Sequence, residues 1–112
     1  LDEAIGGAPD GIGAPVKMQR GDLRWRITVP DNGQLPFDGL YPALISWDGP
    51  DPATSLPDTG ARLVSLTLSH PDAGSLGWAF SMLTDDDRVT VRTGPPGLTA
   101  VIHTAGGERV LA

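Results

Sequence analysis

Apolar and polar residues alternate along residues 62–70 with the two-residue period of a half-buried strand. The apolar positions of this run are Val64, Leu66 and Leu68, and serine or threonine separates them. After Pro71-Asp72 the apolar positions take near-four spacing, at Leu76, Phe80 and Leu83. That spacing is typical of an amphipathic helix, so we expect a helix over Ala73–Leu83 that packs on the apolar face of a sheet.

Short alternating runs return after this helix. They cover Arg88–Arg92, Leu98–Thr104 and Glu108–Leu111. Gly94-Pro95-Pro96-Gly97 and Gly106-Gly107 interrupt them, as expected of hairpin connections. The order strand, helix, strand, strand, strand predicts one complete βαβββ module over residues 61–112.

The first part of the chain repeats this pattern without its opening strand. Strands are expected at Val16–Arg20, Leu23–Val29 and Tyr41–Trp47, and Gly21-Asp22 fits a type II′ hairpin turn. Residues 1–5 resemble the last turn of a helix that ends at Gly6-Gly7. We therefore interpret residues 1–47 as a truncated first module that contributes three antiparallel strands. We also expect the chain to be a piece of a longer protein.

Residues 48–60 are rich in proline and glycine, and we expect a linker there without regular structure. The fold class that follows for the whole chain is α+β, a single domain fragment assembled from βαβββ modules.

Composition narrows the classes of function. The net charge of −6 and the pI near 4.5 argue against nucleic acid as a partner, because neutralising phosphates requires clustered lysine and arginine. The absence of cysteine excludes disulfides and thiolate metal sites and fits a cytoplasmic location. No apolar run approaches the length needed to cross a membrane, so we expect no membrane partner.

The chain resembles the glyoxalase-like domains of the vicinal oxygen chelate superfamily, which includes glyoxalases, bleomycin resistance proteins and dioxygenases. The matching stretches are Gly21–Pro30, Leu35-Pro36-Phe37, Leu44–Trp47, Leu66–Asp72 and Gly94–Leu98. They look like the C-terminal part of such a domain. The resemblance implies sheets that curl into a cup around a ligand, with an upstream module missing from this chain.

The resemblance also implies where metal ligands would stand. Active members chelate a divalent metal through His and Glu on the opening and closing strands of a module. The corresponding positions here hold Ser65, seven residues before Asp72, and Leu111, four residues after Gly107. Neither side chain is a usual ligand for such a metal. We therefore expect no metal ligand in this chain, and a divalent metal only with ligands from missing upstream sequence.

Arg24, Arg26 and Ser46 are the candidate ligand-binding residues. Arg24 and Arg26 flank Trp25, and two guanidinium groups side by side on a sheet face could bind a carboxylate or a phosphate. The alternative is an exposed polar face that pairs with nearby aspartates. Trp25 and Trp47 are expected on the apolar faces of neighbouring strands, where they either pack in the core or stack on a ligand.

Three other groups have two interpretations each. His70 is either a ligand or base, or the corner between strand and helix with Asp72 as the helix N-cap. His103 either faces the cup or is a surface residue, since no carboxylate or second histidine is near it in sequence. The residues Asp85-Asp86-Asp87 lack the closing glutamate of a calcium loop, so we expect a solvated loop.

The sequence thus predicts a glyoxalase-like protein of unknown substrate whose cup binds a small acidic metabolite. Whether it is an enzyme stays open, because no catalytic motif is present. The alternative is a non-catalytic binding or sequestration module, or an assembly module. In the last case a homodimer would form through Trp78 or an open sheet edge.

Overall fold

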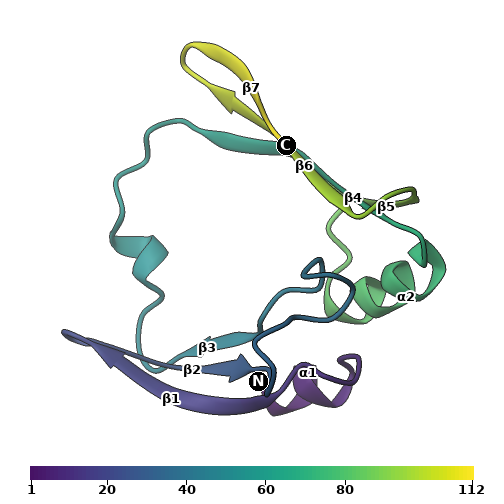
Figure 1. Cartoon of the computed structure of the whole chain (residues 1–112). Coiled ribbons are helices and arrows are strands. Elements are labelled where there is room, and N and C mark those ends of the chain that lie inside the picture. Colours follow the sequence, from purple (N-terminus) through teal and green to yellow (C-terminus); the bar gives the residue numbers. More distant parts are fainter. The chain divides into compact units, whose positions relative to one another are not determined.

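The structure is a computed structural model that describes all 112 residues, Leu1–Ala112 (Figure 1). The chain divides into two compact units, Leu1–Pro57 and Asp58–Ala112. The first unit contains α1 (Asp2–Gly6), β1 (Ala14–Arg20), β2 (Leu23–Val29), β3 (Ile45–Trp47) and the 3₁₀ turn η1 (Pro52–Ser55). The second contains β4 (Arg62–His70), α2 (Ala73–Leu83), β5 (Val89–Thr93), β6 (Gly97–Thr104) and β7 (Gly107–Leu111).

The first unit contains an antiparallel sheet with the strand order β1-β2-β3. Arg20 lies opposite Leu23, so the β1–β2 hairpin closes through the two residues Gly21 and Asp22. Gly21 has a φ of 59° while Asp22 keeps a negative φ, as a type II′ turn requires. The hairpin expected from the sequence is therefore confirmed.

The third strand is shorter than the sequence indicates. We expected a strand over Tyr41–Trp47, but β3 begins at Ile45. The backbone N–H of Tyr41 donates to the carbonyl of Pro36 instead of to a strand, and Pro42 has no N–H to donate. These bonds hold Tyr41 in a loop, where its side chain is buried at 1% exposure.

One buried threonine joins this loop to the sheet. The backbone N–H of Thr28 donates to the carbonyl of Leu44, and the Thr28 Oγ1 accepts from the N–H of Leu44, both over 2.9 Å. Thr28 and Leu44 are both buried. The hydroxyl thus satisfies a backbone donor that water cannot reach.

The expected linker does contain regular structure, and that expectation was wrong in this respect. Residues 52–55 form the 3₁₀ turn η1. The carboxylate of Asp51 accepts from the N–H of Ala53 over 2.9 Å, and Pro52 occupies the first turn, where no N–H is needed. The boundary between the two units falls within the segment 48–60.

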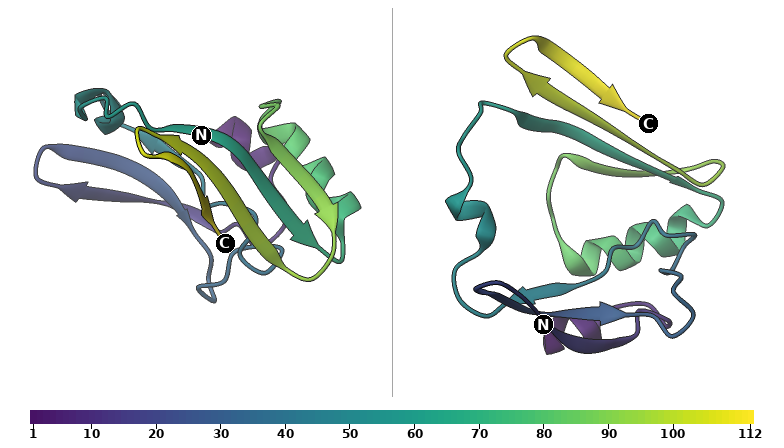
Figure 2. Two further views of the ribbon diagram at one scale, coloured as in Figure 1. Left: turned by 90° about the horizontal axis from the view of Figure 1, so that it is seen from above. Right: turned by 60° about the vertical axis from the view of Figure 1, so that its left-hand side comes forward.

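The second unit has the order strand, helix, strand, strand, strand, and its sheet order is β5-β4-β6-β7. β4 and β5 are parallel, whereas β6 pairs antiparallel with both β4 and β7. Helix α2 spans the predicted residues and lies along one face of this sheet (Figure 2). The α+β class with a βαβββ module is confirmed.

The core of the second unit lies between α2 and the sheet. Leu76 of α2 and Leu68 of β4 are 0% and 1% exposed. Gly77 of α2 faces Val91 of β5, and a Cβ placed at Gly77 would lie 3.9 Å from the Val91 Cβ, in ordinary van der Waals contact. Val64 does not join this core, contrary to our expectation, because the strand pairing shifts between Leu63 and Ser65 and leaves it 43% exposed.

We predict that Thr28→Val destabilises the protein by about 1–3 kcal/mol, because valine keeps the shape but leaves the N–H of Leu44 buried without an acceptor. Urea unfolding followed by tryptophan fluorescence measures this change. Thr90→Val, at an exposed strand position, is the matched control and should stay within about 0.5 kcal/mol. Equal stability of Thr28→Val and the unchanged protein would contradict the role of the hydroxyl.

Candidate ligand-binding face of the first unit

Five polar side chains share one face of the three-stranded sheet, which we call the basic face. Arg26 lies opposite Lys17 on β1 and opposite Ser46 on β3, and Arg24 lies opposite Gln19. Directly opposed residues of an antiparallel pair point to the same side. The register therefore brings Arg24, Arg26 and Ser46 together and adds two residues that the sequence pattern did not single out. The basic face consists of Lys17, Gln19, Arg24, Arg26 and Ser46.

The charges on this face are not balanced by close partners within the sheet. Lys17 and Arg26 are directly opposed, and like charges in that position repel each other. Asp2 of α1 lies 3.9 Å from Arg26, but its side chain is 86% exposed, so this ion pair is weak. Three cations with one weakly paired carboxylate suit an anion that supplies several oxygen acceptors.

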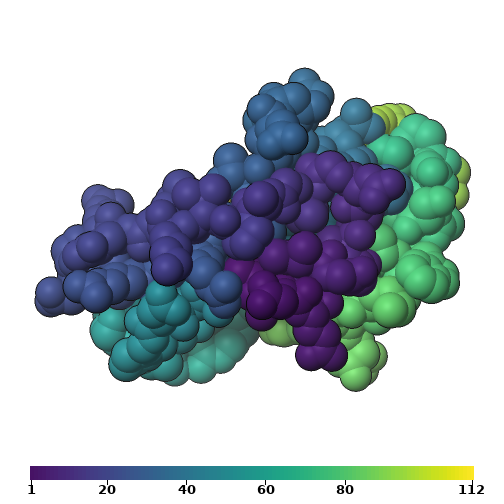
Figure 3. Space-filling view, turned by 90° about the horizontal axis from the view of Figure 1, so that it is seen from below, coloured from purple at the N-terminus to yellow at the C-terminus, as the bar shows by residue number.

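The two ends of the basic face differ in accessibility. Towards α1, Thr28 is buried and the side chain of Arg26 is 33% exposed. Figure 3 shows the N-terminal residues, in purple, beside the strands of this unit. At the other end Arg24 and Gln19 are exposed, and Lys17, level with Arg26, is exposed on the edge strand β1. The open end of the face is thus the end near the hairpin.

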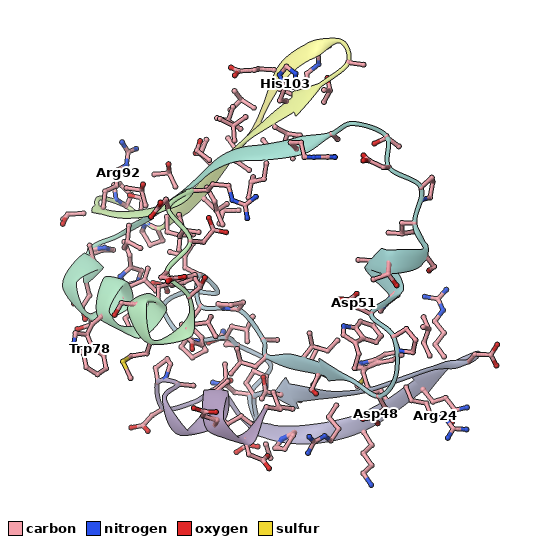
Figure 4. The ribbon with its side chains drawn as sticks, turned by 180° about the vertical axis from the view of Figure 1, so that it is seen from behind. Arg24, Asp48, Asp51, Trp78, Arg92 and His103 are labelled. Atoms are coloured by element: carbon pink, nitrogen blue, oxygen red, sulfur yellow. The ribbon has the colours of Figure 1, made fainter.

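A pocket of about 390 Å³ lies at this open end. Its lining consists of Lys17, Gln19, Arg24 and Asp48 together with Met18 and Trp25, whose register places them on the opposite face. The backbone N–H of Asp48 donates to the carbonyl of Arg24 over 2.8 Å, which fixes Asp48 beside the sheet (Figure 4). A ligand here would meet two cations, one amide and one carboxylate beside one thioether and one indole. This combination suits an acid that also carries a hydroxyl or an amine.

The opposite face of the same sheet carries the tryptophans. The ring centroids of Trp25 and Trp47 are 5.2 Å apart and the rings are tilted by 48°, a favourable packing geometry. Both residues are half-buried rather than fully enclosed. The apolar neighbours Val16 and Met18 are each 41% exposed. The two rings therefore pack mainly on each other, at an apolar surface that is only partly covered.

The two histidines have different surroundings. His70 is 9% exposed, and its Nδ1 accepts from the N–H of Asp72 over 2.9 Å, while the carboxylate of Asp72 accepts from the N–H of Ser75. The interpretation of His70 as the strand-to-helix corner is confirmed. His103 is exposed and lies opposite Glu108 in the strand register. The sequence pattern did not reveal this carboxylate as a neighbour, because the pairing crosses a hairpin.

The residues present do not fit a chelated metal. No group of three or more His, Cys, Asp or Glu side chains is placed to hold an ion. Asp86 of the acidic loop is instead bound to the guanidinium of Arg88 over 2.9 Å from Nε.

Two exposed ion pairs shift carboxyl pKa values. The hydrogen bonds from Arg62 lower the pKa of Asp58 to about 2, with a smaller contribution from the N–H of Gly60. The hydrogen bonds from the side chain and then the backbone of Arg88 lower the pKa of Asp86 to about 2. Both pairs lie within the second unit, away from the basic face in sequence, and we assign them to local structure.

A family model described as a glyoxalase-like domain matches residues 4–84, which is more than half of the chain. No curated protein and no solved structure matches the chain significantly. None of its helices has the length and apolar character needed to cross a membrane.

We predict that Arg88→Gln raises the pKa of Asp86 from about 2 towards the ordinary value of about 3.9. Because the folded-state pKa is depressed, the stabilisation from this pair is present above about pH 4 and is lost as the pH falls through about 2. Carboxyl carbon NMR across this window measures the pKa. An unchanged pKa of Asp86 in Arg88→Gln would show that the guanidinium is not the cause, and Asp58 serves as the internal control.

Proposed function

The chain belongs to the glyoxalase-like domain family of the vicinal oxygen chelate superfamily, and from this premise we propose that it binds a small acidic metabolite on its basic face. The observation that carries the proposal is the register of β1 against β2. It opposes Lys17 to Arg26 and places Arg24 two residues away on the same side. Such a cluster repels itself in the empty state and gains stability when an anion binds.

The basic face provides different contacts for different parts of an acid. Arg24 and Arg26 are planar donors that bind a carboxylate or phosphate through two parallel hydrogen bonds. Lys17 adds a point charge, and Gln19 and Ser46 add neutral hydrogen-bonding groups. Asp48 at the pocket disfavours a second acidic group on that side. We therefore propose a monoacid with one additional donor as the preferred ligand.

We propose that this chain by itself binds its ligand without transforming it. The family premise would allow a metal-dependent enzyme, but the positions that the resemblance implies hold Ser65 and Leu111. The residues His103 and Glu108 are paired in register but provide only two donors. The catalytic alternative requires metal ligands from another segment or another chain.

A second candidate function is assembly. The side chain of Trp78 on α2 is 66% exposed and Met82, one turn later, is 58% exposed. Exposed large apolar residues on one helix face are typical of contact surfaces. A homodimer through this face would be compatible with ligand binding by the first unit.

We predict that Arg24→Gln weakens the binding of small hydroxy acids at least tenfold, since a hydrogen bond to a charged group contributes about 1.5–3 kcal/mol. NMR titration with lactate, glycerate and phosphate measures the dissociation constant at fixed salt concentration. The matched control is Arg92→Gln, an exposed arginine on β5, which should leave the affinity unchanged. Equal losses in both variants would indicate nonspecific charge attraction and contradict the site.

We also predict that the purified chain, loaded with Zn²⁺, Ni²⁺ or Mn²⁺ and then dialysed, retains far less than one metal ion per chain. Elemental analysis measures this ratio. One ion per chain, lost in His103→Ala together with Glu108→Gln, would contradict the proposal of metal-free binding and favour an enzyme.

A further inference from the structure

A second cavity lies within the first unit, on the side of the sheet opposite to the basic face. It has a volume of about 240 Å³ and lies between the hairpin end of the sheet and η1. Its apolar lining includes Leu23, Trp47, Pro50 and Pro52. Arg24 also belongs to the lining. Because side chains alternate along β2, its register opposite Gln19 assigns its guanidinium to the basic face.

Three carboxylates belong to the same lining, and they differ in availability. The carboxylate of Asp51 already accepts from the N–H of Ala53. Asp22 and Asp48 are exposed, and Asp48 is held in place through its own backbone bond to Arg24. Figure 4 shows Asp48 at the edge of the sheet and Asp51 on the η1 side. The cavity thus combines an indole ring with acids at its margin.

We propose that this cavity binds a small alkylated ammonium ion. The face of an indole ring attracts cations more strongly than any other side-chain ring. Apolar walls of leucine and proline accommodate the alkyl groups of such an ion, and Asp22 and Asp48 neutralise its charge. The indole of Trp47 is also held in a fixed orientation by its packing against Trp25.

The size and the charge of the cavity exclude other ligand classes. A volume of about 240 Å³ lies below the range of about 300–1,000 Å³ that drug-sized ligands occupy, so the ligand has few heavy atoms. An anion would be repelled by the carboxylates. A small metal ion gains nothing from an apolar lining and prefers several oxygen ligands. Arg20 lies opposite Leu23 in register but does not line the cavity.

The test compares choline with 3,3-dimethylbutan-1-ol, which has the same shape without the charge. Tryptophan fluorescence and the indole N–H signals in NMR spectra report binding. We expect choline to saturate the Trp47 signal and the neutral alcohol to bind at least tenfold more weakly. Equal binding of the two compounds, or no response to millimolar choline, would overturn the proposal. Failure of the hydroxy acid titration would leave this result unaffected. Arg24 and Asp48 belong to both linings, but choline binding is read from the indole of Trp47, which lines this cavity and not the pocket of the basic face.

Variants separate the contribution of the ring from that of the acid. Asp48→Asn keeps the backbone bond to Arg24 and should weaken choline binding about tenfold, and Trp47→Leu should abolish it. Trp78→Leu, on α2 of the second unit, is the control and should bind choline normally. If Trp47→Leu does not fold, the choline affinity of Asp48→Asn is the deciding measurement. Unchanged choline binding in that variant would contradict the proposed ammonium site.

Phosphocholine headgroups of lipids carry the same ammonium chemistry. Vesicles of phosphatidylcholine are therefore tested beside free choline. Binding to free choline without binding to vesicles supports the proposal of a small soluble ligand. Binding to vesicles without binding to free choline would refute it in favour of a membrane surface.

Discussion

The register of the β1–β2 hairpin is the constraint on which the chemistry of the first unit depends. Gly21 adopts a φ of 59° in the two-residue turn, which pairs Arg20 with Leu23 and fixes every later pair. A shift by one residue would move each side chain to the other face. Lys17 would then leave the side that it shares with Arg24 and Arg26, and Met18 would no longer lie opposite Trp25. The turn thus determines which side chains of β1 join each face of β2, while the pairing of Trp25 with Trp47 depends on the β2–β3 register.

In the second unit, the packing of α2 on the sheet depends on the hydrogen-bonded corner between β4 and α2. His70 accepts the N–H of Asp72 while Asp72 caps the helix, so two side chains separated by Pro71 satisfy backbone donors that the turn would otherwise leave free. The corner directs α2 back along the sheet, where Leu76 and Leu68 form the core. A histidine that resembles a catalytic residue in the sequence has a structural role here.

The sequence predicted those elements in which one local signal was strong. Alternation over seven residues predicted β2, and near-four spacing predicted α2, both with their observed bounds. The bounds of β3 were wrong because they depend on a hydrogen bond to Pro36, which no periodicity reports. The position of Lys17 opposite Arg26 could have been predicted by counting outward from the Gly21-Asp22 turn. The pairing of Glu108 with His103 follows in the same way from counting outward from the β6–β7 turn.

The basic face is proposed to bind an acid, although the protein as a whole is acidic. The chain has a net charge of −6, so its long-range field repels anions and attracts cations. At physiological ionic strength the Debye length is about 8 Å, and charges beyond that distance are largely screened. Lys17, Arg24 and Arg26 are immediate neighbours in the sheet and act within this distance. Salt therefore weakens the repulsion between the net charge of the chain and an anion more than it weakens the attraction to these three cations. The register of three side chains, rather than the charge of the whole chain, thus selects the anion.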